Sequence, residues 1–266
     1  NTRSYVSGFE NDSKVWADYY KVAFRFMMNQ PGERSLIGAI VAPNCLHIHT
    51  VLSVTFKSHE LLVEFSALTS SIVLDFFIKT VGKAALATST IDSFPLDIPR
   101  KYKNSLLCRA LLLNCLTKSY APLWEELWKE EFSKEEWSID NSRLKTFKSL
   151  TSTWDNTVPL RNYFERRLAL VEIDVLSAMA LGLSLKDLEM IYSIQFPVLQ
   201  QNENDTWYDQ KGNIVFTCSK GLTGVGLDRK QWELIRYQKE GETYVHTIDP
   251  AKSELYGGQL VTYYAP

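Results

Sequence analysis

The sequence predicts an α+β fold, with a small mixed sheet and a buried helix followed by a helical region that carries a β-hairpin. Three observations support this class. Apolar patterns with a period of two are concentrated before residue 57. Patterns with helical spacing then dominate as far as residue 194. A turn between two short aromatic and β-branched segments follows. Because strands and helices are segregated along the chain, α+β is favoured over an alternating α/β fold.

Three strands are expected near the N-terminus. Residues 14–28 are rich in aromatic and β-branched side chains that mostly alternate, which favours a strand. Pro31 and Gly32 mark the turn that follows. Residues 35–42, SLIGAIVA, form a nearly continuous apolar run, which predicts a central strand covered on both faces. Residues 45–56 alternate again and predict a third strand.

A single buried helix is predicted over residues 59–81. Its apolar face consists of Leu61, Phe65, Leu68, Ile72 and Phe76. No charge lies between Glu64 and Asp75, so most faces of the helix should be buried, and the polar residues within this run argue against a membrane span. Asp75 and Lys79 stand four residues apart and are expected to pair on the exposed side. Gly82 is the expected C-terminal cap.

The second half of the chain is predicted to be mainly helical. Pro95 and Pro99 interrupt an extended segment and place a domain boundary near residue 100. This divides the chain into an α+β domain over residues 1–100 and a helical connector with a hairpin and tail over residues 101–266. The expected helices span residues 104–119, 121–132, 158–181 and 185–194.

Three local signals add detail to this region. Ser133 and Glu136 match a capping box. The longest helix has an apolar stripe of Phe164, Leu168, Val171, Val175 and Ala178. Residues 205–217 predict a hairpin with its turn at residues 210–213.

Composition and motifs exclude several classes of function. The net charge of −2 does not indicate a nucleic-acid binder, so such a role requires a local basic surface. The four cysteines match no zinc spacing, and together with the absence of an opening signal peptide they favour a reduced, cytoplasmic protein. A nucleophile elbow, a P-loop and an Asn/Asp-Pro-Pro-aromatic motif are all missing.

A few charged or ligand-type residues have two interpretations. His47 and His49 form half of a metal site or, as we favour, have a surface role. Arg161, Arg166 and Arg167 form a solvated helix face or contact phosphates. Glu172 and Asp174 point about 200° apart on a helix, so they do not form a carboxylate pair. A nucleic-acid recognition module and a protein-interaction scaffold remain, with a detached enzyme third.

Four stretches resemble the C-terminal portion of large bacterial DNA adenine methyltransferases of restriction–modification or phage-defence systems. These include type IIG enzymes and the methylase of DISARM-like systems. The stretches are YYKVAFRFMMNQPGERSLIGAIVAPN, LTSSIVLDFFIKTVGKAALATSTIDSFPLDIP, the segment from RRLALVEIDVLSAMALGLSLKDL to DTWYDQKGNIVFT, and YGGQLVTYYAP. Where that family has an Asn-aromatic pair before its Pro-ended segment, this chain has STIDSF, so no base-reading Asn is transferred.

The resemblance implies a DNA sequence-recognition module of an S-adenosylmethionine-dependent DNA N6-adenine methyltransferase. The catalytic domain would be absent from this chain, which would hold no cofactor; S-adenosylmethionine would bind the parent enzyme. The implied partners are double-stranded DNA and defence-system proteins, without a membrane. The alternative is a protein-interaction scaffold of a defence complex. Since recognition surfaces combine cations for phosphates with polar groups for bases, the candidate DNA contacts are Arg25, Arg34, His47, His49, Lys57, Lys79, Lys83, Thr88, Ser89 and Thr90.

Overall fold

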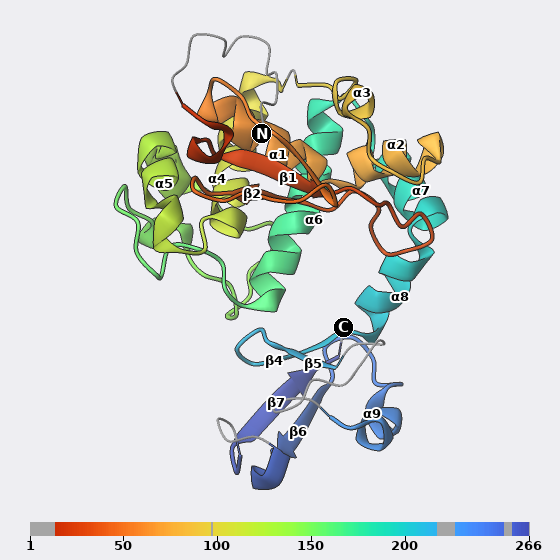
Figure 1. Ribbon diagram of the computed structural model, residues 1–266. Helices are drawn as coiled ribbons and strands as arrows, with labels where there is room; N and C mark the ends of the chain where they lie inside the picture. The colour runs from red at the N-terminus through yellow and green to blue at the C-terminus, as the bar shows by residue number, and fades with distance from the viewer. Residues whose placement is uncertain (1–13, 97, 217–226, 253–256, 266) are drawn as a thin grey trace.

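The computed structural model describes residues 14–96, 98–216, 227–252 and 257–265. It confirms the α+β class. A three-stranded sheet near the N-terminus and a set of helices form the larger part of the molecule, and a second small sheet follows at the C-terminal end (Figure 1).

The first sheet contains β1 (Lys21–Arg25), β2 (Gly38–Val41) and β3 (Val51–Val54) in the order β2-β1-β3. Both pairings are antiparallel, so the expectation of a mixed sheet was wrong. The three strands are also shorter than the apolar patterns predicted, and a 3-10 turn, η1 (Trp16–Asp18), precedes them. β1 is the central strand of this order, and its Val22 and Phe24 are buried on the face that packs against α1.

The prediction of a doubly covered central strand over residues 35–42 was wrong. β2 lies at an edge of the sheet, and Gly38 and Ala39 are exposed. The prediction failed because Gly38 and Ala39 count as apolar in the sequence pattern but have little side-chain surface to bury. Gly38 is required for packing rather than for burial: a Cβ there would lie 2.6 Å from the ring of Phe24.

The predicted helix over residues 59–81 is two helices, α1 (His59–Thr69) and α2 (Ile72–Val81), which meet at an angle of 67°. Ser71 causes the break, because its hydroxyl accepts the backbone N–H of Leu74 and so begins a new helix. Gly82, with a φ of 68°, ends α2 as predicted. Within the described ranges, no single helix is long and apolar enough to cross a membrane; only α1 and α2 taken together pass that test.

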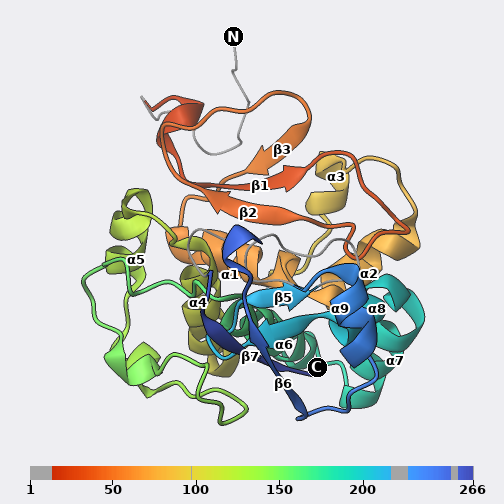
Figure 2. The ribbon, with the colours of Figure 1, turned by 90° about the horizontal axis from the view of Figure 1, so that it is seen from below.

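The helical part follows. It consists of α3 (Thr88–Ile91), α4 (Arg100–Asn114), α5 (Ala121–Leu127), α6 (Tyr163–Ala180), α7 (Leu185–Gln195) and α8 (Pro197–Asp205), with 3-10 turns η2 (Lys118–Tyr120), η3 (Glu130–Lys134) and η4 (Phe147–Ser149). The first sheet lies as a layer on α1, and α4 and α6 lie behind it (Figure 2). One hydrophobic core extends from Tyr20 to Ile173 and so includes residues on both sides of position 100. The division at that position stays a prediction.

Two local predictions in this region were wrong. Ser133 does not form a capping box, because its hydroxyl donates to the carbonyl of Glu130 within η3. The expected apolar stripe of α6 is only partly buried, and Val171 and Val175 are 37% and 39% exposed. The buried face of α6 instead includes Ile173, Glu172 and Asp174. The two carboxylates can be buried there because they have partners; Glu172, for example, accepts from the Arg109 guanidinium at 2.5 Å.

The C-terminal part has its own hydrophobic core and sheet. The hairpin is confirmed as β4 (Trp207–Asp209) and β5 (Ile214–Phe216). After α9 (Arg229–Ile235), the strands β6 (Thr243–Thr247) and β7 (Leu260–Tyr264), separated by η5 (Pro250–Lys252), complete a sheet of order β5-β4-β7-β6. The core of this part includes Trp207, Trp232 and Tyr263.

Candidate nucleic-acid interface

A groove of about 750 Å³ lies between β3 and the segment that contains α3. β3 is the edge of the first sheet, and no strand among the described residues pairs with its outer side. The groove is lined by Trp16, His47, Leu52, Ser53, Val54, Thr55, Phe56, Phe65, Thr88, Ile91, Asp92, Phe94 and Leu96.

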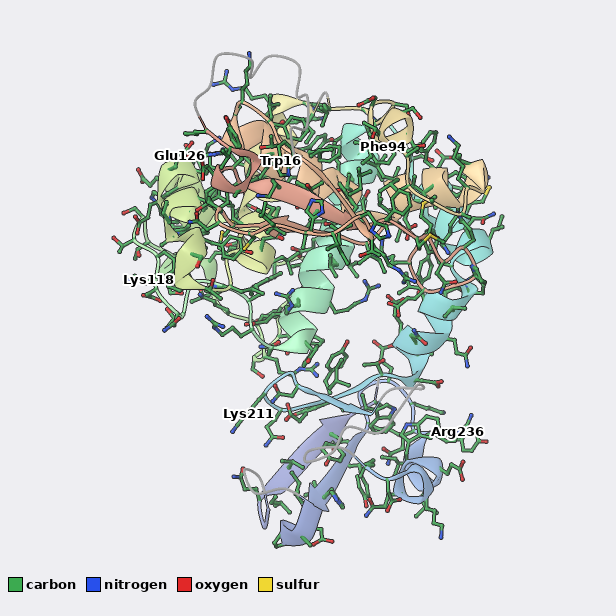
Figure 3. The ribbon with its side chains drawn as sticks, in the orientation of Figure 1. Trp16, Phe94, Lys118, Glu126, Lys211 and Arg236 are labelled. Atoms are coloured by element: carbon green, nitrogen blue, oxygen red, sulfur yellow. The ribbon has the colours of Figure 1, made fainter. Side chains whose placement is uncertain are left out.

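Aromatic rings form much of the wall. The ring centroids of Phe56 and Phe65 are 5.1 Å apart, and those of Phe65 and Phe94 are 6.2 Å apart. Trp16 comes from the segment before β1. Trp16 and Phe94 lie at the end of the molecule opposite the C-terminal sheet (Figure 3). Phe65 and Phe94 are buried core residues, so Trp16 and Phe56 are the partly exposed rings of the groove that are available for stacking against a planar group such as a nucleic-acid base.

Polar groups accompany the rings. A ring nitrogen of His47 lies 2.6 Å from the hydroxyl of Ser53, which fixes the imidazole at the groove. Thr88 and Asp92 project from the opposite wall. Lys83 donates to the Thr90 hydroxyl at 3.4 Å, so the ammonium is held beside α3. The groove therefore combines aromatic rings with hydrogen-bonding groups, one of which, Asp92, is acidic.

The first sheet and its connections carry very few acids. Residues 19–58 contain four cations, Lys21, Arg25, Arg34 and Lys57, but one acidic residue, Glu33. The carboxylate of Glu33 accepts the side-chain amide of Asn202 at 2.6 Å, from α8. Lys21 is fully buried and Arg34 is engaged with Ser70 and Asp174, so the exposed cations of this region are Arg25 and Lys57. They give the sheet region a small positive balance that the net charge of the whole chain conceals, which is favourable for binding a polyanion.

The ten residues predicted to contact DNA divide into four groups. His47 and Thr88 line the groove itself. Lys57, Lys83 and Ser89 are exposed and adjoin it, since Lys57 follows Phe56, Ser89 belongs to α3 and Lys83 binds α3, whereas Thr90 of α3 is buried. Arg25 and His49 are exposed outside the groove, and Arg34 and Lys79 are engaged in internal contacts.

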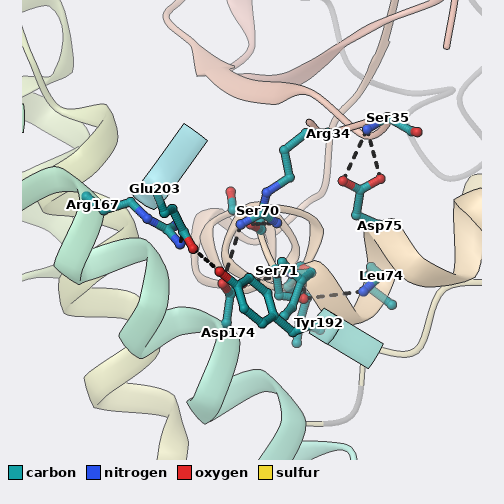
Figure 4. A network of polar contacts seen from close by, with 12 residues as sticks. Arg34, Ser35, Ser70, Ser71, Leu74, Asp75, Arg167, Asp174, Tyr192 and Glu203 are labelled. Carbon is teal, nitrogen blue, oxygen red and sulfur yellow. Dashed lines mark hydrogen bonds and ion pairs between the residues drawn. The ribbon is translucent and has the colours of Figure 1, made fainter. Parts of the chain in front are cut away.

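Arg34 belongs to a polar network between the β1–β2 connection and three helices (Figure 4). Its guanidinium donates to the carbonyl of Ser70 at 3.3 Å and pairs with Asp174 of α6 at 3.4 Å. Asp174 also accepts the backbone N–H of Ile72 at 2.7 Å, at the start of α2. Burial raises the pKa of Asp174, which Arg34 partly offsets. These contacts hold the α1–α2 break in place.

Lys79 and Asp75 are internal as well, so their expected pairing on an exposed face was wrong. The Lys79 ammonium donates to the carbonyls of Gln30 at 2.8 Å and Gly32 at 2.9 Å. The Asp75 carboxylate is fully buried and accepts the backbone N–H groups of Ser35 and Leu36. Both side chains therefore fasten the β1–β2 connection to α2, because a long polar connection needs partners for its backbone groups.

The three arginines at or near the start of α6 have structural contacts within the protein. Arg161 donates to the carbonyl of Leu116, and Arg166 donates to those of Leu113 and Leu160. Arg167 forms an ion pair with Glu203 of α8. His47 and His49 do not belong to a metal-binding group, since no cluster of three ligand-type side chains occurs among the described residues.

Trp16, Phe56 and Phe94 were not among the residues predicted from the sequence. Each occupies an apolar position in a strand-like or turn-rich segment, so its pattern resembles that of a core residue. The near-absence of acids over residues 19–58 is the sequence signal that singles out this region.

No protein-family model, curated protein or solved structure matches this chain. Fold and groove together define an α+β protein with an aromatic groove along the edge of an acid-poor antiparallel sheet.

Proposed function

We propose that this chain is the DNA sequence-recognition module of an S-adenosylmethionine-dependent DNA N6-adenine methyltransferase of a restriction–modification or phage-defence system. The observation that carries the proposal is the groove beside β3, where aromatic rings, His47 and Thr88 meet at an acid-poor sheet. The family resemblance of the sequence supplies the class of enzyme. Recognition of DNA requires a surface of this chemical kind.

In this proposal the residues have separate roles. Lys57 and Lys83 hold backbone phosphates beside the groove, and their charges supply the salt-dependent part of the affinity. His47, Thr88 and Ser89 offer hydrogen-bonding groups to base edges, which distinguish one base pair from another. Arg34 and Lys79 act indirectly, because their internal contacts fix the sheet against α2 and α6.

Methyl transfer would belong to a separate catalytic domain that binds S-adenosylmethionine. A methyltransferase turns its target base out of the helix, so the flanking sequence has to be read by another surface. We therefore expect no transfer of methyl groups to DNA by this chain alone. A radiolabelled methyl-transfer assay checks this expectation.

The alternative, a protein-interaction scaffold of a defence complex, is favoured by one observation. Met190 and Ile194 lie one turn apart on α7 and are 50% and 64% exposed, and Val198 of α8 is exposed nearby in the sequence. Exposed apolar side chains that are grouped on one helix are typical of a protein-binding surface. A scaffold would lose partner binding on Ile194→Ser while having no affinity for DNA.

The decisive experiment measures binding of the purified chain to a fluorescently labelled duplex pool over a range of salt concentrations. We expect the logarithm of the affinity to fall linearly with the logarithm of salt concentration. Lys57→Ala and Lys83→Ala should each weaken binding and reduce that slope by about 1, because each removes one phosphate contact.

Lys186→Ala is the matched control, since Lys186 is exposed on α7, away from the groove. Its affinity and slope should equal those of the wild type. Lys79 is unsuitable as a test, because its replacement would also free two carbonyls of the β1–β2 connection. Absence of salt-dependent binding by the wild type, or equal losses in all three lysine variants, would contradict the proposal.

A further inference from the structure

The connection between β2 and β3 carries two of the most exposed large apolar side chains of the first sheet. Leu46 is 68% exposed and Ile48 is 71% exposed, and only His47 separates them. Exposing two neighbouring aliphatic side chains is unfavourable in water, so a binding partner that covers them would gain hydrophobic free energy.

The connection is held at several points. The N–H of Asn44 donates to the carbonyl of Ala17 at 2.7 Å, and the N–H of Val51 donates to that of Ile48 at 3.1 Å. His47 lines the groove and contacts Ser53. Leu46 and Ile48, on either side of His47, do not line the groove and are exposed to solvent.

The surroundings of this pair suit a polyanion. Residues 43–57 contain no acid, and the two apolar side chains alternate with His47 and His49. Arg25 is exposed and lies opposite Val51 in the sheet, at the base of the connection. Exposed apolar side chains next to the positive charge of Arg25 are complementary to a DNA duplex, whose negatively charged phosphates flank a stack of apolar nucleobase faces.

We propose that Leu46 and Ile48 form a wedge that enters a base step of DNA bound along the groove. The proposal rests on the proposed function and adds a mechanism to it. Aliphatic side chains inserted between bases partly unstack them and bend the duplex. Arg25 and His49 would then lie against the adjacent phosphates, while His47 and Thr88 remain at the groove.

The test uses the full chain and duplexes that carry 2-aminopurine, an adenine analogue whose fluorescence rises when it is unstacked. The wild type should increase this fluorescence severalfold at saturation. The double variant Leu46→Ala/Ile48→Ala should keep salt-dependent binding, lose affinity by about tenfold, and abolish the increase. Leu185→Ala is the control, because Leu185 is 67% exposed on α7 and should change neither quantity.

The outcomes separate the two proposals. Salt-dependent binding by the wild type without unstacking overturns the wedge and leaves the recognition proposal standing. A wild type that does not bind DNA overturns both. If Leu46→Ala/Ile48→Ala instead abolishes binding to anionic lipid vesicles and leaves unstacking unchanged, the pair inserts into membranes and the wedge is again overturned.

Cys45 provides a probe that needs no change to the wedge. Its thiol is exposed, whereas Cys108 and Cys115 are buried. Cys218 lies outside the described residues and is replaced by Ser for this experiment. Saturating DNA should slow maleimide labelling of Cys45 at least severalfold, because the neighbouring Leu46 would be covered. An unchanged labelling rate in the presence of bound DNA overturns the wedge.

Discussion

Asp75 shows how a single residue can have a different role from the one its sequence spacing suggests. An acid four residues before a lysine is expected to form a helical surface pair. In the structure Asp75 is fully buried and accepts two backbone N–H groups of the β1–β2 connection. Burial raises the pKa of its carboxyl, which the N–H of Leu36 and the charge of Arg34 partly offset.

This raised pKa predicts a specific pH dependence. The folded state binds the Asp75 proton more tightly than the unfolded state, so the stability due to this group is complete below its ordinary pKa of 3.8. That stability is lost as the pH rises through the raised folded pKa, and a tenfold difference in proton affinity between the two states corresponds to about 1.4 kcal/mol. Relative to Asp75→Asn, the wild type should therefore become less stable as the pH rises above 3.8.

Urea unfolding of both proteins at a series of pH values measures this difference. Taking the difference cancels the contributions of other carboxyls, such as Glu60, whose pKa is lowered by its hydrogen bond with Lys129. A wild type that gains stability over Asp75→Asn as the pH rises would show that the backbone donors outweigh burial.

At the scale of elements, the division of residues 59–81 into α1 and α2 positions most of the polar network. The angle of 67° brings the start of α2 to Asp174, which accepts the N–H of Ile72. Hydrophobic spacing continues across the break, so the pattern alone predicts one helix. The break depends on polar groups that satisfy the backbone at a helix end, and two of these come from distant segments.

Ser71→Ala should destabilise the protein by about 1 kcal/mol, since it removes the N-cap of α2. The Ser71 hydroxyl accepts from the N–H of Leu74 and donates to the carbonyl of Leu68, and both would lose a buried partner. Urea unfolding measures the loss. Ser149→Ala is the control, because Ser149 is exposed in η4, and it should change stability by less than about 0.5 kcal/mol. Equal effects of the two substitutions would argue against a capping role.

At the scale of the whole molecule, the C-terminal sheet meets the helical part where the hairpin contacts the start of α6. The carbonyl of Gly212 accepts the N–H of Phe164, and the rings of Phe164 and Tyr208 are 5.5 Å apart. Gly212 has a φ of 78°, and a Cβ there would lie 2.6 Å from the side-chain oxygen of Asn162, the N-cap of α6. This glycine therefore allows both the turn and the close contact.

Gly212→Ala should loosen the C-terminal part from the helices. Gly241→Ala is the matched control, because Gly241 has a φ of 83° but open space around its Cα. Both variants incur the backbone strain, of about 1 kcal/mol or more, and only Gly212→Ala adds a clash. Limited proteolysis should release the C-terminal part faster from Gly212→Ala than from Gly241→Ala. Equal rates would show that the contact does not hold the two parts together.

The sequence determined the features that depend on neighbouring residues. It predicted the α+β class, the cap at Gly82, the hairpin over β4 and β5, and the start of α7 at residue 185, because periodicity, capping and turn preferences act within a few residues. It also contains the acid-poor region over residues 19–58, which requires no coordinates.

Only the tertiary structure decided which faces are buried and which polar groups have partners. The edge position of β2, the buried carboxylates of α6 and the internal contacts of Arg34 and Lys79 all involve residues far apart in the chain. The groove arises in the same way, since Trp16, Phe56 and Phe94 meet only after the first sheet packs beside α3. Hydrophobic spacing specifies the preference of one segment for burial, whereas partners and cavities depend on how several segments pack together.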